Sequence, residues 1–287
     1  MVNYKSIKLS PGLYFVSTPI GSARDITLRA LDILANADVL AAEDTRTLKK
    51  LLEIHGIQLK NRSLISYHDH NGSKARPRLL AHLEQGKSIA YASEAGTPLI
   101  ADPGFSLLTE VLSLENNVIS APGPCALIAA LTVAGLPTDR FSFEGFLPNN
   151  KSQKEIKLRG LQSYRGTLIF YESAKRLSDT LLKSAEVLGE ERQGVVCREI
   201  TKKFEDTQRG SLKKLSEFYC DKNIKGEIVL LIAGATDPDV DVSKVEQHLK
   251  DALKSMSVKD SAEAVALALN VSRRDVYQLA LKIKSSS

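Results

Sequence analysis

The sequence predicts two successive α/β domains followed by a small, purely helical one. Over roughly the first 135 residues, short apolar runs alternate with amphipathic stretches, a pattern typical of a wound, largely parallel sheet. The alternation resumes after residue 146 with more charged helices, whereas about the last 45 residues show helical periodicity alone. We therefore expect domains at residues 1–135, 136–235 and 242–287.

The first predicted domain begins with a buried strand at residues 13–17. The helix after it is expected to begin at Asp25, a suitable N-cap, because leucines then recur at helical spacing. Further strands are expected at residues 37–42, 64–67, 89–92 and 117–120. The helices between and after them are expected at residues 48–55, 78–85 and 126–134, with another beginning near Phe105.

The second predicted domain is entered through residues 136–146, in which Phe141, Phe143 and Phe146 lie between two Leu-Pro pairs. We interpret this stretch as a segment that crosses between domains. The elements expected after it are helices at 151–162 and 177–188, strands at 167–171, 195–198 and 228–233, and a hairpin partner at 205–210. An acidic linker at 236–241 then leads to three helical stretches.

A long loop, residues 93–104, follows the strand at 89–92. Most connections between a strand and a helix have two to six residues, so an ordinary connector would be shorter. Gly96 and Gly104 allow close backbone approach, while Pro98 and Pro103 hold the loop in one shape. Because loops at the carboxyl ends of strands bind ligands in α/β sheets, we predict that this loop binds one.

The composition is that of an ordinary globular chain with a modest basic excess. The 287 residues include 39 Lys and Arg and 34 Asp and Glu, a net charge of +5, which is compatible with an anionic partner without requiring one. No stretch approaches the length of a membrane span, and the first residues lack the apolar core of a signal peptide. Cys125, Cys197 and Cys220 form neither a disulfide framework nor a zinc motif, so we expect a cytoplasmic protein.

Polar side chains gather where three of the predicted strands end. The carboxyl ends of parallel strands meet at one edge of a sheet, so these side chains are expected to line one crevice. They are Glu43, Asp44 and Arg46, then His68, Asp69 and His70, and finally Asp102. The two histidines lack a third ligand at useful spacing, so no metal site is expected. The alternative for residues 43–46 is a purely structural ion pair.

The ligand is not expected to be a nucleotide held by its phosphates. The sequence has no Gly-x-x-x-x-Gly-Lys-Ser/Thr, and no Gly-x-Gly-x-x-Gly follows the first strand. An apolar loop shaped by prolines favours a nucleoside with an uncharged or zwitterionic tail.

Eight short motifs, in this order, resemble the tetrapyrrole methylase superfamily, whose members bind S-adenosylmethionine between two α/β domains. The motifs are STPIG at 17–21, EDTR at 43–46, YHDHN at 67–71, SEAGTPLIADPG at 93–104, APGP at 121–124, GLPTDRF at 135–141, FYES at 170–173 and REITK at 198–202. The resemblance covers residues 13–233. It implies two α/β domains of the tetrapyrrole methylase (class III methyltransferase) type, and the helical pattern of the remaining residues adds a small C-terminal helical domain.

The resemblance also implies which positions contact S-adenosylmethionine. They are Pro19, Ile20, Gly96, Thr97, Ile100, Cys125 and Ala126 in the first domain, and Tyr171, Gly226 and Glu227 in the second. The sequence departs from the usual pattern at Glu94, where Asp is common, and at Ala174-Lys175, where Pro-His is common. Cys125 stands where Ser is usual and could weaken a hydroxyl contact to the cofactor.

The motifs are most similar to those of enzymes that methylate a cytidine ribose 2′-oxygen in 16S ribosomal RNA. This implies that the partner is 16S rRNA or the small ribosomal subunit, and that the protein is a homodimer. Catalysis would need in-line positioning and help in removing the hydroxyl proton, without a metal ion. We expect Glu43 or Asp44 to orient or deprotonate the hydroxyl, Arg46 to hold an adjacent phosphate, and His68 to be the alternative base.

RNA also requires a basic surface, and the sequence ends with a pattern that resembles a helix-turn-helix. Candidate phosphate contacts are Lys49, Lys50, Arg76, Arg78, Lys202, Lys203 and Arg209. A turn at 270–272 precedes a helix that has Ser272 as its expected N-cap and begins with Arg273 and Arg274. We expect this part to help grip rRNA. The alternative is a structural cap, and specific DNA recognition is not expected.

Two other functions fit the sequence. The first is methylation of a tetrapyrrole or another small molecule, which a competing acceptor would reveal. The second is a helix-turn-helix regulator that uses its α/β part to sense a ligand, which would bind specific duplex DNA without methyl transfer.

Overall fold

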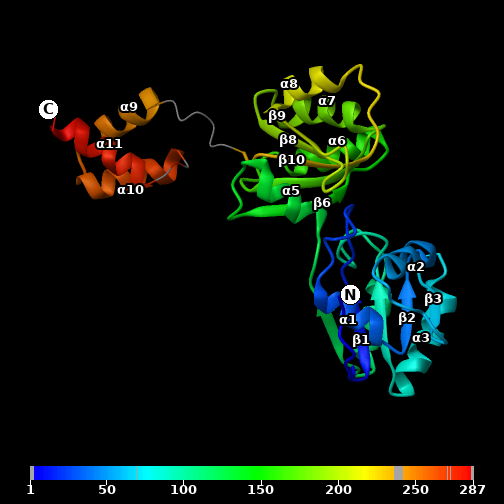
Figure 1. Cartoon of the computed structure of the whole chain (residues 1–287). Helices are drawn as coiled ribbons and strands as arrows, with labels where there is room; N and C mark the ends of the chain where they lie inside the picture. Colours follow the sequence, from blue (N-terminus) through cyan, green and yellow to red (C-terminus); the bar gives the residue numbers. More distant parts are fainter. Residues whose placement is uncertain (1–2, 69, 236–241, 270, 272, 286–287) are drawn as a thin grey trace. The chain divides into compact units, whose positions relative to one another are not determined.

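The computed structural model describes residues 3–68, 70–235, 242–269, 271 and 273–285 (Figure 1). The chain divides into two units, residues 1–233 and 234–287. Asp69, the predicted linker at 236–241 and the predicted cap Ser272 lie outside the described residues, and so does the side chain of Arg274.

The first sheet is parallel throughout, with strand order β3-β2-β4-β1-β5. Its strands are β1 (Gly12–Val16), β2 (Val39–Ala42), β3 (Ser63–Ser66), β4 (Ser88–Ala92) and β5 (Val118–Ala121). The wound, parallel sheet predicted for the first half of the chain is therefore confirmed. Because all five strands run the same way, the loops that follow them emerge at one edge.

Helices cover both faces of the first sheet. Alternate residues of β1 point to opposite faces, so Tyr14 and Val16 pack with α1 (Leu28–Asn36) and α2 (Thr45–Ile54). Leu13 and Phe15 pack with the other two helices, which are α3 (Gly72–Glu84) and α4 (Phe105–Ser113). Every residue of β1, β2 and β4 is buried, as expected for strands covered on both sides.

Three helix starts differ from the prediction, and one of these differences is that α2 begins at Thr45 and not at residue 48. Thr27, not Asp25, caps α1, because its side chain accepts a hydrogen bond from the Ala30 backbone N–H at 3.1 Å. Asp25 belongs instead to a turn in which its N–H donates to the Ser22 carbonyl. Helix α3 begins earlier than predicted and includes Pro77, which deletes a single hydrogen bond of the helix.

The second sheet is mixed, with strand order β6-β7-β10-β8-β9. Its strands are β6 (Phe141–Phe146), β7 (Thr167–Ser173), β8 (Gln193–Arg198), β9 (Asp206–Ser211) and β10 (Glu227–Ile232). Only β6 and β7 pair in parallel. The interpretation of residues 136–146 as a crossing segment is therefore wrong from Phe141 onward, because residues 141–146 form an edge strand of the second sheet. The predicted hairpin partner of β8 is β9.

The second sheet has helices on both faces as well (Figure 1). The helices α6 (Lys151–Gly160), α7 (Leu177–Leu188) and α8 (Leu212–Tyr219) pack on one face. The helix α5 (Ala126–Ala134) packs on the other, where Ala130 and Leu131 meet Ile169 and Val229. The polypeptide thus leaves the first sheet after β5 and immediately covers the second.

The second unit consists of α9 (Val242–Ala252), α10 (Val258–Leu269) and α11 (Arg273–Ser285). These helices share a small core that contains Leu249, Ala262, Val265 and Ala280. Between α10 and α11, Glu263 and Arg273 form an ion pair of 2.9 Å. Within the described residues, no helix combines the length and apolar character that a membrane crossing requires.

Candidate functional site

A cavity of about 430 Å³ lies between the loops of the first sheet and the strands β7 and β10 of the second. A volume of this order suits a ligand of nucleoside size or larger. The lining residues come from six places: Ile20 after β1, Glu43 after β2, residues 94–97 and 100–102 after β4, Ala126 at the start of α5, residues 171–173 of β7, and residues 226–229 at the start of β10. Phe146 and Ile200 complete it.

Backbone and hydroxyl hydrogen bonds tie three loops of the first sheet to one another. Thr18 and Gly96 exchange two backbone hydrogen bonds of 2.9 and 3.0 Å, which join the loops after β1 and β4. The Thr97 hydroxyl donates to the Pro124 carbonyl at 2.9 Å, which adds the loop after β5. The cavity wall is therefore fixed before any ligand binds.

The backbone on both sides of the cavity is strained. Leu99 and Ala101 have φ values of +72° and +61°, and Glu199 and Thr201, in the loop after β8, have +52° and +64°. Each such residue costs on the order of 1–3 kcal/mol and persists only where its surroundings enforce it. Strain of this kind concentrates at functional sites, which supports a binding role for the cavity.

A side chain would be strained at two glycines of the lining, because both have a left-handed backbone and close neighbours. Gly96 has φ +85°, and a Cβ there would lie 3.3 Å from Ile20. Gly226 has φ +107°, and a Cβ there would lie 2.5 Å from the Glu199 side chain. Glycine therefore allows the backbone a left-handed conformation at one point on each side of the cavity.

Most positions that the family resemblance assigns to the cofactor line this one cavity. They are Ile20, Gly96, Thr97, Ile100, Ala126, Tyr171, Gly226 and Glu227. Pro19 and Cys125 do not line it, although each directly precedes a residue that does. The structure thus brings together loops that are separated by as many as two hundred residues of sequence.

Tyr171 closes one side of the cavity. Its ring makes edge contacts with Phe143 and Phe146, at centroid distances of 4.8 and 5.8 Å. Burial raises the pKa of the Tyr171 hydroxyl, and the neighbouring Cys125 and Asp102 add to the shift. The hydroxyl therefore stays protonated at neutral pH and can donate a hydrogen bond.

The residues predicted on the substrate side do not all line the cavity. Glu43 lines the cavity, whereas Asp44, Arg46 and His68 do not. Asp44 caps α2 and accepts hydrogen bonds from the backbone and guanidinium of Arg46, which lower the pKa of Asp44 to about 2. The His68 backbone N–H donates to the Asn71 side chain at 2.9 Å.

The surroundings of Asp102 do not stabilise the ionised form of its carboxyl group. It lines the cavity, and its Oδ2 is buried and has no hydrogen-bond partner. Burial, Glu43 and Glu94 together raise the pKa of Asp102 to about 7. The sequence marked Asp102 as a strand-end acid but assigned its loop to cofactor binding alone, because burial could not be read from the pattern.

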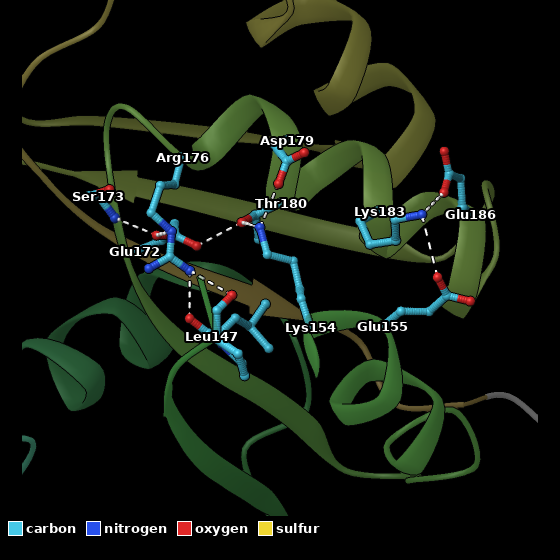
Figure 2. Close-up of polar contacts among 11 residues, drawn as sticks. Leu147, Lys154, Glu155, Glu172, Ser173, Arg176, Asp179, Thr180, Lys183 and Glu186 are labelled. Atoms are coloured by element: carbon cyan, nitrogen blue, oxygen red, sulfur yellow. Dashed lines mark hydrogen bonds and ion pairs between the residues drawn. The ribbon is translucent and has the colours of Figure 1, made fainter. Parts of the chain in front are cut away.

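Glu172, at the end of β7, connects the cavity to a buried polar network (Figure 2). One carboxylate oxygen accepts from the Ser173 N–H at 2.8 Å and the other from the Thr180 hydroxyl at 2.7 Å. Lys154, which is 2% exposed, donates to Thr180 at 3.1 Å and to Asp179 at 2.6 Å. Sequence reasoning missed this network because Lys154 and Thr180 look like ordinary helix residues.

The described residues contain no group of three or more His, Cys, Asp or Glu that could hold a metal ion. The rings of His68 and His70 lie 6.1 Å apart.

Comparison with known proteins identifies both units. Residues 12–216 match the family described as Tetrapyrrole (Corrin/Porphyrin) Methylases, and residues 239–284 match the RsmI C-terminal HTH domain. The ribosomal RNA small subunit methyltransferase I of Mesorhizobium japonicum is 40% identical, over 97% of this chain and 94% of its own. The protein of the same name from Vibrio cholerae is 42% identical, over 95% of each chain.

A solved structure shares the fold of the first unit. Uroporphyrin-III C-methyltransferase from Thermus thermophilus, complexed with S-adenyl homocysteine, has a TM-score of 0.54 and 17% identity. The match covers 77% of this chain and 97% of that one. At this identity the likeness shows the fold alone.

The two sheets, their helical layers and the family match define a methyltransferase of the tetrapyrrole methylase type. Identity of about 40% over almost the whole length then shows that the chain belongs to the ribosomal RNA small subunit methyltransferase I family. The predicted family, fold class and enzyme class are thereby confirmed.

Proposed function

We propose that the protein transfers a methyl group from S-adenosylmethionine to the 2′-oxygen of a cytidine ribose in 16S rRNA. The observation that carries this proposal is the single cavity that gathers eight of the ten positions expected to contact the cofactor. The names of the relatives support rRNA as the acceptor. The bound S-adenyl homocysteine of the Thermus protein supports the choice of cofactor.

The lining of the cavity fits S-adenosylmethionine. When bound, this cofactor supplies a methyl carbon already activated by a sulfonium. Ile20 and Ile100 offer apolar surface for an adenosine, and Gly96 and Gly226 contribute no side chain to the lining. The acidic side chains around Asp102 suit a positively charged ligand.

We propose that Glu43 acts on the hydroxyl, because it is the predicted substrate-side residue that lines the cavity. Asp44 would hold Arg46, whose side chain is 89% exposed and accessible to a phosphate of RNA. His68 remains the alternative base. An acid at Glu43 would orient the hydroxyl and accept its proton as the oxygen is methylated.

Some of the candidate RNA contacts are exposed, whereas others already form ion pairs or hydrogen bonds within the protein. Lys49, Lys50, Arg78 and Lys203 are exposed, and we propose them as phosphate contacts. The other three have structural partners: Arg76 pairs with Glu110, Lys202 with Glu199 and Glu227, and Arg209 donates to carbonyl groups at the end of α5.

We also propose a homodimer that acts in the cytoplasm, with domains at 1–135, 136–235 and 242–287. The exposed apolar side chains Ile128 and Val133 on α5 support an interface there. Sedimentation equilibrium of the full chain, alone and with both residues changed to Ser, would measure the assembly.

The function is tested by methyl transfer from labelled S-adenosylmethionine to 16S rRNA and to small ribosomal subunits. A tetrapyrrole precursor serves as the competing acceptor. We expect label in RNA, at a ribose whose 3′ phosphodiester then resists alkaline hydrolysis. Label in the precursor alone would indicate a small-molecule methylase, and specific duplex DNA binding without transfer would indicate a regulator.

A further inference from the structure

The cavity carries carboxylates and no lining cation. Among the described residues that line it are Glu43, Glu94, Asp102, Glu172 and Glu227, and none of the lining residues is Lys, Arg or His. Cations outside the lining compensate two of these charges. Arg176 pairs with Glu172 at 3.3 Å, and Lys202 pairs with Glu227 at 2.6 Å.

Among the described residues, the charged groups that act on Asp102 inside the cavity are acids. Glu43 faces it from the end of β2, Glu94 from its own loop, and the Tyr171 hydroxyl from β7. Arg46, the nearest cation on α2, acts on Glu94 and is hydrogen-bonded to Asp44. Since Asp102 Oδ2 is buried and accepts no hydrogen bond, the protonated carboxyl is favoured while no cation is present.

The methyl donor and its demethylated product differ in charge at the sulfur. The sulfur of S-adenosylmethionine is a sulfonium cation, whereas that of S-adenosylhomocysteine is a neutral thioether. A cation inside a cavity of low dielectric favours ionisation of a nearby carboxyl, and a neutral group does not.

We propose that Asp102 is the residue by which the cavity distinguishes the charged donor from the neutral product. Asp102 releases its proton to solvent when the donor binds, and takes up a proton from solvent when the product occupies the site. The product is then held without the attraction that held the donor. This inference rests on the proposed function, because it takes S-adenosylmethionine as the ligand.

The exchange makes donor binding depend on pH in a defined direction. With a pKa of about 7 in the ligand-free protein, the ionised fraction of Asp102 falls as the pH is lowered. The association constant for the donor should fall with it, by about fourfold from pH 7.5 to pH 6 when the donor lowers the pKa of Asp102 by about one unit. The association constant for the product should not fall over the same range.

Isothermal titration calorimetry of the full chain tests the exchange without any acceptor. S-Adenosylmethionine and S-adenosylhomocysteine are titrated between pH 6 and pH 8, in pairs of buffers with different ionisation enthalpies. The difference in heat between buffers gives the protons released per ligand bound. At pH 7 we expect about half a proton from Asp102 on binding the donor and none on binding the product.

Two variants and one control assign the proton to its residue. Asp102→Asn should abolish the release and reduce donor affinity at pH 7.5 by about tenfold, the factor equivalent to one pKa unit, with product affinity within about twofold. Glu94→Gln removes one of the like charges, so the midpoint of the pH dependence should move to lower pH. Glu115→Gln, at an exposed turn after α4, should behave as the wild type. Protons released by the ligand itself contribute equally in every variant, so they cancel in the comparison.

Equal proton release by donor and product would overturn the inference, and so would a pH dependence that Asp102→Asn leaves unchanged. If neither ligand binds, the inference and the proposed cofactor fail together. Donor-selective proton release without methyl transfer to 16S rRNA would support the inference and count against the proposed acceptor.

Discussion

Glu43 and Asp44 show how much two neighbouring carboxyl groups can differ. Glu43 follows β2 directly and lines the cavity, while Asp44 turns to the first turn of α2 and caps it. The sequence motif Glu-Asp-Thr-Arg could not distinguish these positions, because either acid can cap a helix or face a ligand. The choice follows from where β2 ends and where α2 begins.

Glu43→Gln should cut methylation at least tenfold and leave cofactor binding intact, because the amide keeps the shape and loses the base. Single-turnover methylation of 16S rRNA and calorimetric titration of the cofactor measure the two effects. Glu53→Gln, which changes an exposed acid near the end of α2 in the same way, is the matched control. Full activity in Glu43→Gln would remove Glu43 from the mechanism.

The free energy of unfolding should fall as the pH rises, because Asp102 then ionises. Its folded pKa of about 7 lies above the ordinary aspartate pKa of 3.8, so its stabilising contribution is complete below pH 3.8 and is lost as the pH rises to 7. The loss is at most about 4 kcal/mol, and is reduced by access of solvent to the cavity. Asp102→Asn should therefore gain stability relative to the wild type between pH 5 and pH 8.

Urea unfolding of both proteins at several pH values measures this difference. If the two free energies of unfolding run parallel from pH 5 to pH 8, Asp102 ionises as an ordinary surface acid. The sequence identified Asp102 as a strand-end carboxyl, but burial and the approach of Glu94 and Glu43 depend on contacts that no local pattern encodes.

At the scale of elements, strong periodicity was sufficient for prediction. Helices α5 and α7 begin and end where their apolar patterns do, and the parallel order of the first sheet follows from its alternation with helices. Helix α8 was missed because it starts at Leu212 directly after β9, with Ser211 as its cap and no loop between them. Strand β6 was misread because its paired Leu-Pro flanks look like a connection.

The polar network beneath Glu172 should contribute to the stability of the second sheet and its helices. Thr180→Val keeps the shape of a fully buried side chain but deprives Glu172 and Lys154 of a shared hydroxyl (Figure 2). Hydrogen bonds to charged groups contribute about 1.5–3 kcal/mol, so the free energy of unfolding should fall by this order.

Thr167→Val is the matched control for this change. Thr167 is equally buried, but its hydroxyl donates to the neutral Pro137 carbonyl at 2.7 Å, so a loss of only about 1 kcal/mol is expected. Thermal unfolding of both variants makes the comparison. Equal losses of stability would show that the hydrogen bonds of Thr180 to Lys154 and Glu172 contribute no more than a hydrogen bond to a neutral group.

At the scale of the whole molecule, every residue that lines the cavity lies between Ile20 and Val229. The division into α/β and helical parts could be predicted from periodicity. The pairing of two sheets around one cavity could not, since it depends on contacts between distant segments, such as the hydrogen bond from the Ser22 N–H to Thr201 at 3.2 Å.

Removal of residues 236–287 should therefore leave cofactor binding unchanged and weaken binding to 16S rRNA. Fewer phosphate contacts should also make RNA affinity less sensitive to salt, because fewer counterions are released. Calorimetry with the cofactor and filter binding with rRNA at two salt concentrations measure the two properties. Unchanged RNA affinity and salt dependence would mean that the second unit is a structural cap.

The position of β10 has a consequence for how the enzyme is made. This last strand of the chain lies inside the second sheet, between β7 and β8. During translation β7 and β8 are made before β10, so the second sheet cannot reach its full strand order until residue 232 has left the ribosome. Until then one wall of the cavity does not exist. A nascent chain interrupted earlier would carry the loops of the first sheet but no site for a methyl donor.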